Sequence, residues 1–469
     1  MRADGAVIRG DLTFPDDVRL PVVLRHCTFL GNVSGVSSSF GGLVDLSRSR
    51  FRKGVDFREA SFARPLLMSG ITLARGGSVR FDYADFGGAI VLSGADIHGR
   101  TSFSGAQFHS AVRLRGTQIH GDTSFGNASF DDGGDFVGTM FFGAASFGSS
   151  EFRGTADFTT AGFNGAAAFN TARFLAPADF IGASFGGGPK VVPSFYGTRF
   201  DAGARFAGGE FDHGASFDLA EAPAEMDFEG RVFSGPASFS TVRFLGGVDL
   251  THSSLVGLVN FDQAVITRLD LDGAALNDST IVLPESKLHS GQFGHIDELR
   301  LDPNDVGHIR AGNASDNRGA REHALELVEK TARAGGDDNA AREAEIRRRT
   351  LERHDKSAFG RAFDWGILWG IGGYLVRPLH PFLALIALVL IVPLGRAVRR
   401  AWTNWRTIPT GFPSDLGKSI LGIWKFKIGE GSAFETVEAV VYKVMRAVLV
   451  LSIGNVYPTL HNIVGGVLP

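Results

Sequence analysis

The chain has 469 residues and a net charge of −3, with 21% charged and 44% apolar residues, which excludes a disordered tail protein and a strongly basic nucleic-acid binder. Glycine (62) and phenylalanine (40) far outnumber tyrosine, tryptophan and methionine, with five each, and this imbalance is atypical of a globular enzyme. The single cysteine, Cys27, excludes a disulfide framework and a cysteine-based zinc site.

Apolar residues recur every eleven positions along the N-terminal part of the chain. One series runs without interruption from Phe81 to Phe180, and a second series, from Phe86 to Phe185, lies between its members. Of the 40 phenylalanines, 34 lie within residues 1–293, so one repeating structural role explains the excess. We expect this role to be the core, formed in particular by Phe103, Phe108, Phe125, Phe130, Phe136, Phe147, Phe152, Phe158, Phe163, Phe169, Phe174, Phe180, Phe185, Phe206, Phe217 and Phe239.

The residues around each apolar centre predict short extended segments. A small residue usually stands two positions before the centre and a polar or small one stands between them, as in Ala156-Asp157-Phe158. This in-out-in alternation is typical of extended backbone. Four such five-residue units can form one square turn of a solenoid. The repeat changes phase near residues 75–80 and 186–193, where we expect insertions at corners.

The segment Ala156-Asp-Phe-Thr-Thr-Ala-Gly-Phe163 resembles the repeat unit of the pentapeptide-repeat family in its Phe-rich variant, and the resemblance extends over about residues 7–290. It implies an all-β solenoid, a right-handed quadrilateral β-helix in which two eleven-residue units form each 22-residue turn. The length of the repeat predicts roughly 12 or 13 turns and a rod about 60 Å long. A solenoid filled with Phe and Ala is expected to serve as a binding surface or a spacer.

The rod carries no residue pattern that indicates catalysis, so we expect no enzyme activity, no catalytic residues, no cofactor and no metal. The nearest candidate for a metal site is the pair His98 and His120, which follow apolar centres 22 positions apart and should stack on one face, where two imidazoles can share an ion. The competing interpretation is that these positions are exposed corners that accept any polar residue.

The charge of the rod bears on nucleic-acid mimicry. Some pentapeptide-repeat proteins resemble DNA and bind DNA gyrase, which requires a strongly acidic rod. Residues 1–293 hold 31 acidic and 24 basic residues, a net charge of −7. This mild imbalance favours an ordinary solvated surface, so gyrase binding is the lesser alternative and nucleic acid is not an expected partner.

The Phe repeat ends near residue 294, and we divide the chain there. Residues 1–293 form the repeat domain and residues 294–318 a linker. Residues 319–356 form a helical hairpin, with apolar residues of its first helix on one face and Asp337, Asp338 or Asn339 as N-cap of its second helix. Such a hairpin is expected to pack on itself or on a second copy.

Residues 357–469 form an apolar helical region that we expect to associate with a membrane. Residues 378–395 carry no charged side chain, and a helix of this length extends about 27 Å, close to the thickness of a bilayer core. The competing interpretation is a buried helix of a soluble domain. Flanking aromatic and basic residues favour a span because they resemble interfacial belts; they are Trp365, Trp369, Tyr374, Arg377, Trp402 and Trp405.

Residues 373–379, Gly-Tyr-Leu-Val-Arg-Pro-Leu, resemble a segment of bacterial membrane-anchored pentapeptide-repeat proteins. A second apolar segment starts near Ser432, and residues 447–469 carry no Asp, Glu, Lys or Arg. Some of these relatives end in a potassium-channel-like unit, but the filter sequence Thr-Val-Gly-Tyr-Gly does not occur between the two apolar segments of this chain. We therefore expect a non-enzymatic membrane-anchored scaffold with a protein partner and a homo-oligomer formed through the C-terminal helices. A channel-like or pore-forming protein with the rod as sensor is the main alternative.

The expected location is the cell membrane, with the repeat domain in the cytoplasm. Two features of the sequence favour this orientation. The first residues lack the apolar segment of a secretory signal. Six basic residues precede the apolar segment within residues 347–361 and four follow it within residues 396–406, a bias that by the positive-inside rule places the repeat domain on the cytoplasmic side.

Overall fold

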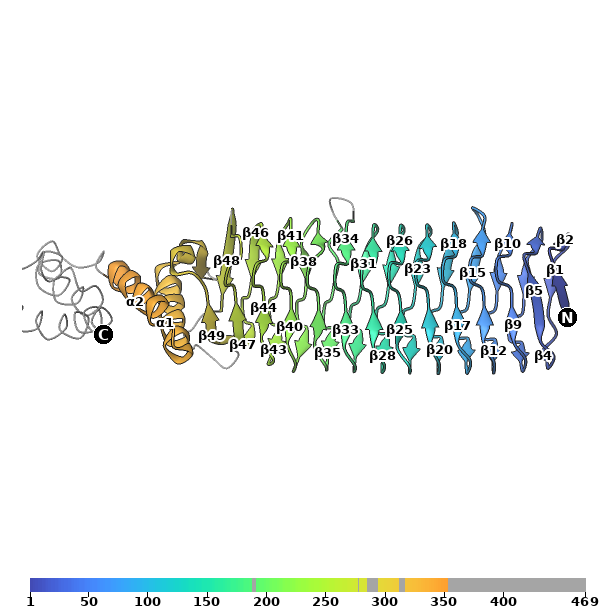
Figure 1. Cartoon of the computed structure of the whole chain (residues 1–469), viewed down its shortest axis with the longest axis horizontal. Coiled ribbons are helices and arrows are strands. Elements are labelled where there is room, and N and C mark those ends of the chain that lie inside the picture. The colour runs from blue at the N-terminus through green and yellow to red at the C-terminus, as the bar shows by residue number, and fades with distance from the viewer. Residues whose placement is uncertain (188–190, 277, 285–293, 312–316, 353–469) are drawn as a thin grey trace, which may run out of the picture. The chain divides into compact units, whose positions relative to one another are not determined.

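The computed structural model describes residues 1–352 except 188–190, 277, 285–293 and 312–316. Contacts divide the chain into two units, 1–348 and 349–469, and the first of these contains nearly all of the described residues. It is a parallel β-solenoid of about 13 turns (Figure 1). This architecture confirms the parallel solenoid predicted from the repeat.

Each turn contains four short strands, most of them two residues long. On one face β14 (Thr72–Leu73), β18 (Asp96–Ile97), β22 (Gln118–Ile119) and β26 (Met140–Phe141) pair in parallel, so each strand pairs with the fourth strand after it. Ile97 pairs with Ile119, 22 positions further along the chain. The sequence period of eleven is therefore half a turn.

The two phase changes coincide with insertions in single turns. Val55 of β11 (Val55–Asp56) pairs with Val79 of β15 (Ser78–Arg80), 24 positions along. Arg173 of β32 (Arg173–Phe174) pairs with Arg199 of β35 (Arg199–Phe200), 26 positions along. Between these sites, and after the second one as far as the pairing of Arg243 with Val265, the spacing is again 22, because inserted residues lie outside the stacked ladders. The last turns depart from it, since Val265 pairs with His295, 30 positions along.

Phenylalanine rings fill the interior. Rings of the same face stack from turn to turn, as Phe158 does on Phe180 at 4.8 Å between centroids and an interplanar angle of 2°. Rings of adjacent faces meet edge to face, as Phe158 and Phe169 do at 88°, an arrangement that aromatic quadrupoles favour. The sixteen phenylalanines expected in the core, from Phe103 to Phe239, are each at most 1% exposed.

A tight turn of the backbone, which forms a corner of the solenoid, follows many of the buried phenylalanines in the sequence. Phe125 is followed by a turn in which the Ala128 N–H donates to the Phe125 carbonyl at 3.1 Å. Asn127 in this turn has a φ of 57°, a left-handed conformation that Gly and Asn tolerate best. This requirement explains part of the glycine content, since Gly105 and Gly138 occupy equivalent corners with φ of 68° and 63°.

The solenoid extends beyond the boundary expected at residue 293. Strands β49 (His295–Arg300) and β50 (Ile309–Ala311) pair with β47 (Val265–Asp270) and β48 (Ser279–Leu283), and the 3-10 helix η1 (Pro303–His308) lies between them. These strands are longer than the repeat strands and lack phenylalanine, so the Phe pattern stops before the sheet does. Part of the expected linker, 294–318, is therefore solenoid.

Two helices follow, α1 (Asn317–Gly335) and α2 (Asp338–Glu352). The Asp337 carboxylate accepts from the Asn339 and Ala340 N–H groups at 3.1 and 3.0 Å, which confirms an N-cap at this position. Helix α1 packs against the last strands of the solenoid, β49 and β50, a contact not included in the expectation that the hairpin packs on itself or on a second copy. The Leu299 N–H donates to Thr331 Oγ1 at 3.2 Å, and Leu325 is fully buried.

Candidate functional site

The filled interior leaves the outer faces as the part of the solenoid that is available for binding. Side chains immediately before and after each buried centre point outward, and the 22-residue register aligns them into ladders along the rod. We name two of these faces. The histidine face is the 12-stranded sheet that contains β18, β22 and β26. The ion-pair face is formed by β16 (Asp85–Phe86), β20 (Gln107–Phe108), β24 (Ser129–Phe130), β28 (Glu151–Phe152), β32, β35 and β39 (Glu221–Ala222).

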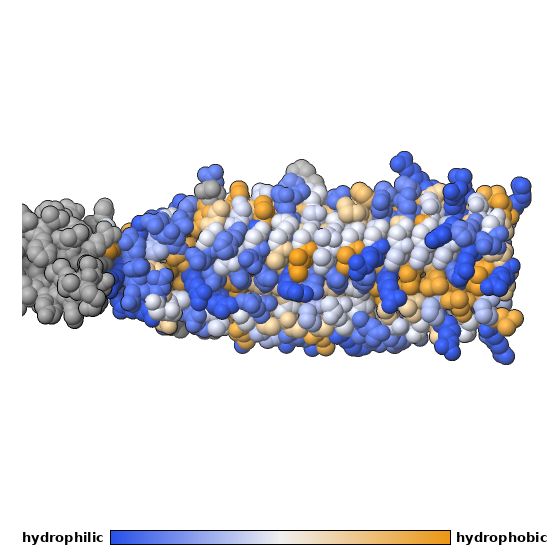
Figure 2. All heavy atoms as spheres, viewed as in Figure 1, coloured by the Kyte–Doolittle hydropathy of each residue, from blue (hydrophilic) through white to orange (hydrophobic). Residues whose placement is uncertain are grey.

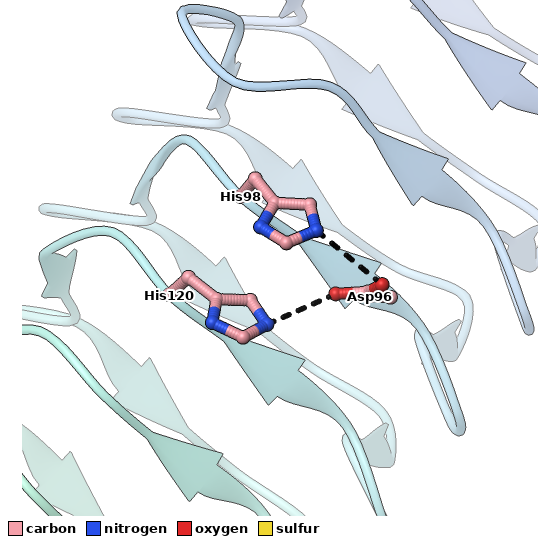
Figure 3. Close-up of side chains that lie close together, drawn as sticks. All are labelled: Asp96, His98 and His120. Carbon is pink, nitrogen blue, oxygen red and sulfur yellow. Dashed lines mark ion pairs between the residues drawn. The ribbon is translucent and has the colours of Figure 1, made fainter.

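Asp96, His98 and His120 converge on the histidine face (Figure 3). Asp96 and His98 flank the buried centre Ile97 and therefore project from the same side of the chain. His120 follows Ile119, the residue that pairs with Ile97 in the next turn. The His120 N–H donates to the Ile97 carbonyl at 2.8 Å, so backbone pairing holds the two histidines at adjacent heights.

The two imidazoles stack and present the same nitrogen to one carboxylate. Their centroids are 4.3 Å apart and their planes differ by 15°. His98 Nε2 lies 3.5 Å from Asp96 Oδ2, and His120 Nε2 lies 3.2 Å from Asp96 Oδ1. One donor atom from each residue falls within 4.8 Å of the others. Two imidazole nitrogens and a carboxylate oxygen are donors that can hold a divalent transition metal.

A third histidine has a different environment, on the ion-pair face. His109 Nδ1 lies 2.7 Å from Asp131 Oδ2 in a hydrogen bond, and His109 Nε2 lies 3.3 Å from Asp85 Oδ1. Arg153 also pairs with Asp131, at 2.5 Å. Hydrogen bonds from His109 and Arg153 lower the pKa of Asp131 below its usual value. His109 thus belongs to an ion-pair cluster in which both ring nitrogens face carboxylates.

Ion pairs continue along this face. Arg173 and Arg199 both contact Asp201, at 3.4 and 2.5 Å, and Arg199 reaches Glu221 at 2.9 Å. Acidic and basic side chains therefore pair over several turns, both within a turn, as Arg199 does with Asp201, and between adjacent turns, as Arg199 does with Glu221. Pairing neutralises much of the acidic charge, so this face is not the continuous anionic surface that resemblance to DNA requires.

The arginine Arg231 has its side chain inside the solenoid. Arg231 is fully buried at a position where other turns carry a small residue such as Ala161 or Ala183. Its Nη1 donates to the Gly208 carbonyl at 2.6 Å and its Nη2 to the Glu210 carbonyl at 3.1 Å. Burial lowers the pKa of Arg231 to about 9, so the guanidinium remains protonated at neutral pH.

Sequence reasoning placed His98 and His120 together but did not include Asp96 as a third donor. The sequence feature that could have indicated all three donors is the segment Asp96-x-His98, followed by a second histidine 22 positions after His98, one turn along. Arg231 was also missed, because a single arginine in a repeat gives no indication that it points inward.

Residues 357–469, with Trp365, Trp369, Tyr374, Arg377, Trp402 and Trp405, lie outside the described residues. Neither described α-helix combines the length and the apolar character needed to cross a bilayer.

Comparison with known proteins supports the repeat assignment. Residues 103–151 match the family profile described as Pentapeptide repeats (9 copies). These residues include the turns that contain His120 and the stacked Phe125 and Phe147. No curated protein and no solved structure matches the chain.

Proposed function

Because this chain is a Phe-rich pentapeptide-repeat protein, we propose that it acts as a non-enzymatic scaffold that binds a protein partner along an outer face of its solenoid. The observation that carries this proposal is the continuous stack of buried phenylalanines, which fills the interior and leaves the outer ladders for recognition. A β-solenoid of this family is itself typical of an interaction scaffold.

The surface has the character of a protein-binding surface. Hydrophilic and apolar side chains are interspersed along the face in Figure 2. Outward apolar residues include Phe142, Leu175 and Leu245, which are 39%, 36% and 42% exposed. Aromatic and aliphatic side chains among charged ones are typical of non-obligate interfaces. The paired charges of the ion-pair face argue against gyrase binding by DNA mimicry.

Affinity capture with the full chain tests the scaffold. Two variants each reverse the charge of three outward arginines by substitution with Glu. One variant changes Arg153, Arg173 and Arg199 on the ion-pair face, and the other changes Arg113, Arg115 and Arg205 on another face. If one face binds, one variant loses a stoichiometric partner that wild type and the other variant retain. Absence of a stoichiometric partner contradicts the proposal, and equal capture by both variants with unchanged melting excludes these two faces.

We propose further that residues 357–469 anchor the scaffold at the cell membrane, with the repeat domain in the cytoplasm and with oligomerisation through the C-terminal helices. The uncharged segment 378–395 and its aromatic flanks support this. Carbonate washing of membranes should release a chain ending at residue 352 but not the full chain. Protease should reach the repeat domain from the cytoplasmic side. Release of the full chain would contradict the anchor, and ion flux in liposomes would favour the channel alternative.

A further inference from the structure

We propose that Asp96, His98 and His120 bind one divalent transition-metal ion, of which Zn²⁺ is the representative, on the histidine face. This inference is independent of the scaffold function. It rests on the chemistry of the three donors, on their separations, on an unsatisfied carboxylate oxygen and on the fixed orientation of the rings.

The separations match those of ligands around one ion. Ligands bound to tetrahedral zinc at 2.0–2.2 Å lie roughly 3.4 Å from each other. The two separations between Nε2 atoms and Asp96 oxygens are 3.5 and 3.2 Å. A small tilt of the stacked imidazoles would aim both lone pairs at a shared point beside the carboxylate. Asp96 therefore lies within reach of an ion held by the two histidines.

Hydrogen bonding leaves the carboxylate unsatisfied. Asp96 Oδ1 is shielded from solvent and has no hydrogen-bond partner among the described residues. His120 Nε2 lies 3.2 Å from it, but this contact does not have the geometry of a hydrogen bond. Shielded oxygen atoms without a partner are rare, since desolvation costs free energy. A bound cation would compensate Oδ1. The His109 cluster shows the contrast, because there Asp131 accepts a 2.7 Å hydrogen bond.

The surrounding side chains fix the site in advance. The Phe142 ring stacks on His120 with centroids 4.5 Å apart and planes within 2°, which restricts rotation of the imidazole. His98 and His120 are 29% and 33% exposed, so an ion can enter from solvent and water can complete its coordination. Because the ligands come from two successive turns, a bound ion would link those turns from outside.

Zinc titration of the full chain tests the site. Protein stripped with a chelator is titrated with Zn²⁺ by calorimetry and by competition with a zinc indicator, and Co²⁺ absorption reports the coordination. The test variants are His98→Gln with His120→Gln, and Asp96→Asn alone. His109→Gln is the control, because it removes a histidine whose two ring nitrogens already face carboxylates of an ion-pair cluster. Thermal unfolding of each variant in the presence of chelator, compared with wild type, checks that the variant is folded.

The expected result is one Zn²⁺ per chain in wild type and in His109→Gln. The double histidine variant should lose this ion, and Asp96→Asn should bind it at least about tenfold more weakly. The Co²⁺ spectrum should disappear in the double variant only. Absence of zinc binding in wild type overturns the proposal. Binding that survives the double substitution, or that His109→Gln removes equally, also overturns it.

Discussion

The guanidinium carbon of Arg231 lies 4.1 Å from the centroid of the Phe211 ring, inside the solenoid. Gly209 makes room for the guanidinium, since a Cβ on Gly209 would lie 2.7 Å from Arg231 Nη1, and the Gly208 carbonyl accepts a hydrogen bond from it. Both glycines have a positive φ, 63° and 69°. Arg231 therefore combines a cation–π contact with hydrogen bonds to carbonyls of a distorted turn.

Replacing Arg231 with Ala should destabilise the solenoid by about 3 kcal/mol, because it leaves a cavity and removes the donors of buried carbonyls. Denaturant unfolding followed by circular dichroism measures this change. Arg243→Ala on the exposed surface is the control and should change stability by less than about 0.5 kcal/mol. Equal effects of the two substitutions would contradict a structural role for the buried guanidinium.

The phenylalanine stack predicts a large effect of a single core truncation. Phe158 stacks between Phe136 and Phe180 at 4.6 and 4.8 Å, so Phe158→Ala should cost about 3–5 kcal/mol. Hydrogen exchange should increase most in adjacent turns, because each turn contacts only its neighbours. The exposed Phe142→Ala is the control. The prediction fails if both substitutions have the same cost.

Asp45 predicts a specific loss of stability in acid. Burial alone would raise the pKa of Asp45, but hydrogen bonds from Ser47 and Arg25 outweigh it and lower the pKa below 3.8. A lowered carboxylate pKa stabilises the folded state above pH 3.8, and this contribution is lost as the pH falls through the folded-state pKa. Asp45→Asn should therefore reduce stability at pH 7 by about 2 kcal/mol and flatten the loss below pH 4.

Urea midpoints measured from pH 7 to pH 2.5 check the Asp45 prediction. The exposed Asp132→Asn serves as control and should follow the wild-type profile. An Asp45→Asn profile that parallels wild type throughout would show that the buried pair with Arg25 does not contribute to acid sensitivity.

Helix α1 should protect the last strands of the solenoid. Thr331→Val keeps the side-chain shape but removes the acceptor of the Leu299 N–H, which should cost about 1 kcal/mol. The Leu299 amide should exchange several-fold faster with deuterium. Lys330→Ala, an exposed change in the same helix, should leave this exchange unchanged. No acceleration in Thr331→Val would mean that the hydroxyl contact is unimportant for the end of the solenoid.

The sequence was sufficient for the parts of the fold that repeat. Phe158 and its equivalents recur at a fixed period, and this period alone implies stacked turns with inward rings. Features that occur once could not be predicted this way. The inward direction of Arg231 depends on the space left by Gly209, one turn before it. The packing of Leu325 against the solenoid depends on tertiary contacts of an ordinary amphipathic helix.

The group formed by Asp96, His98 and His120 was predictable only in part. The period placed His98 and His120 on one face, and the structure places their rings 4.3 Å apart. That Asp96 joins the two histidines could not be predicted without its side-chain conformation, because many outward aspartates of the repeat also flank a buried residue. Asp131, for example, also flanks a buried phenylalanine, yet it pairs with His109 and Arg153.

Site-specific photo-crosslinking in cells tests most directly whether the outer faces of the filled solenoid bind a partner. A photoreactive residue is placed in the full chain at outward positions of each face, in steps of one turn, as at Gln107, Ser129 and Glu151 on the ion-pair face. We predict crosslinks to one protein at successive turns of a single face and none at the other faces. Crosslinks absent from every face, or scattered among unrelated abundant proteins, would contradict the scaffold function.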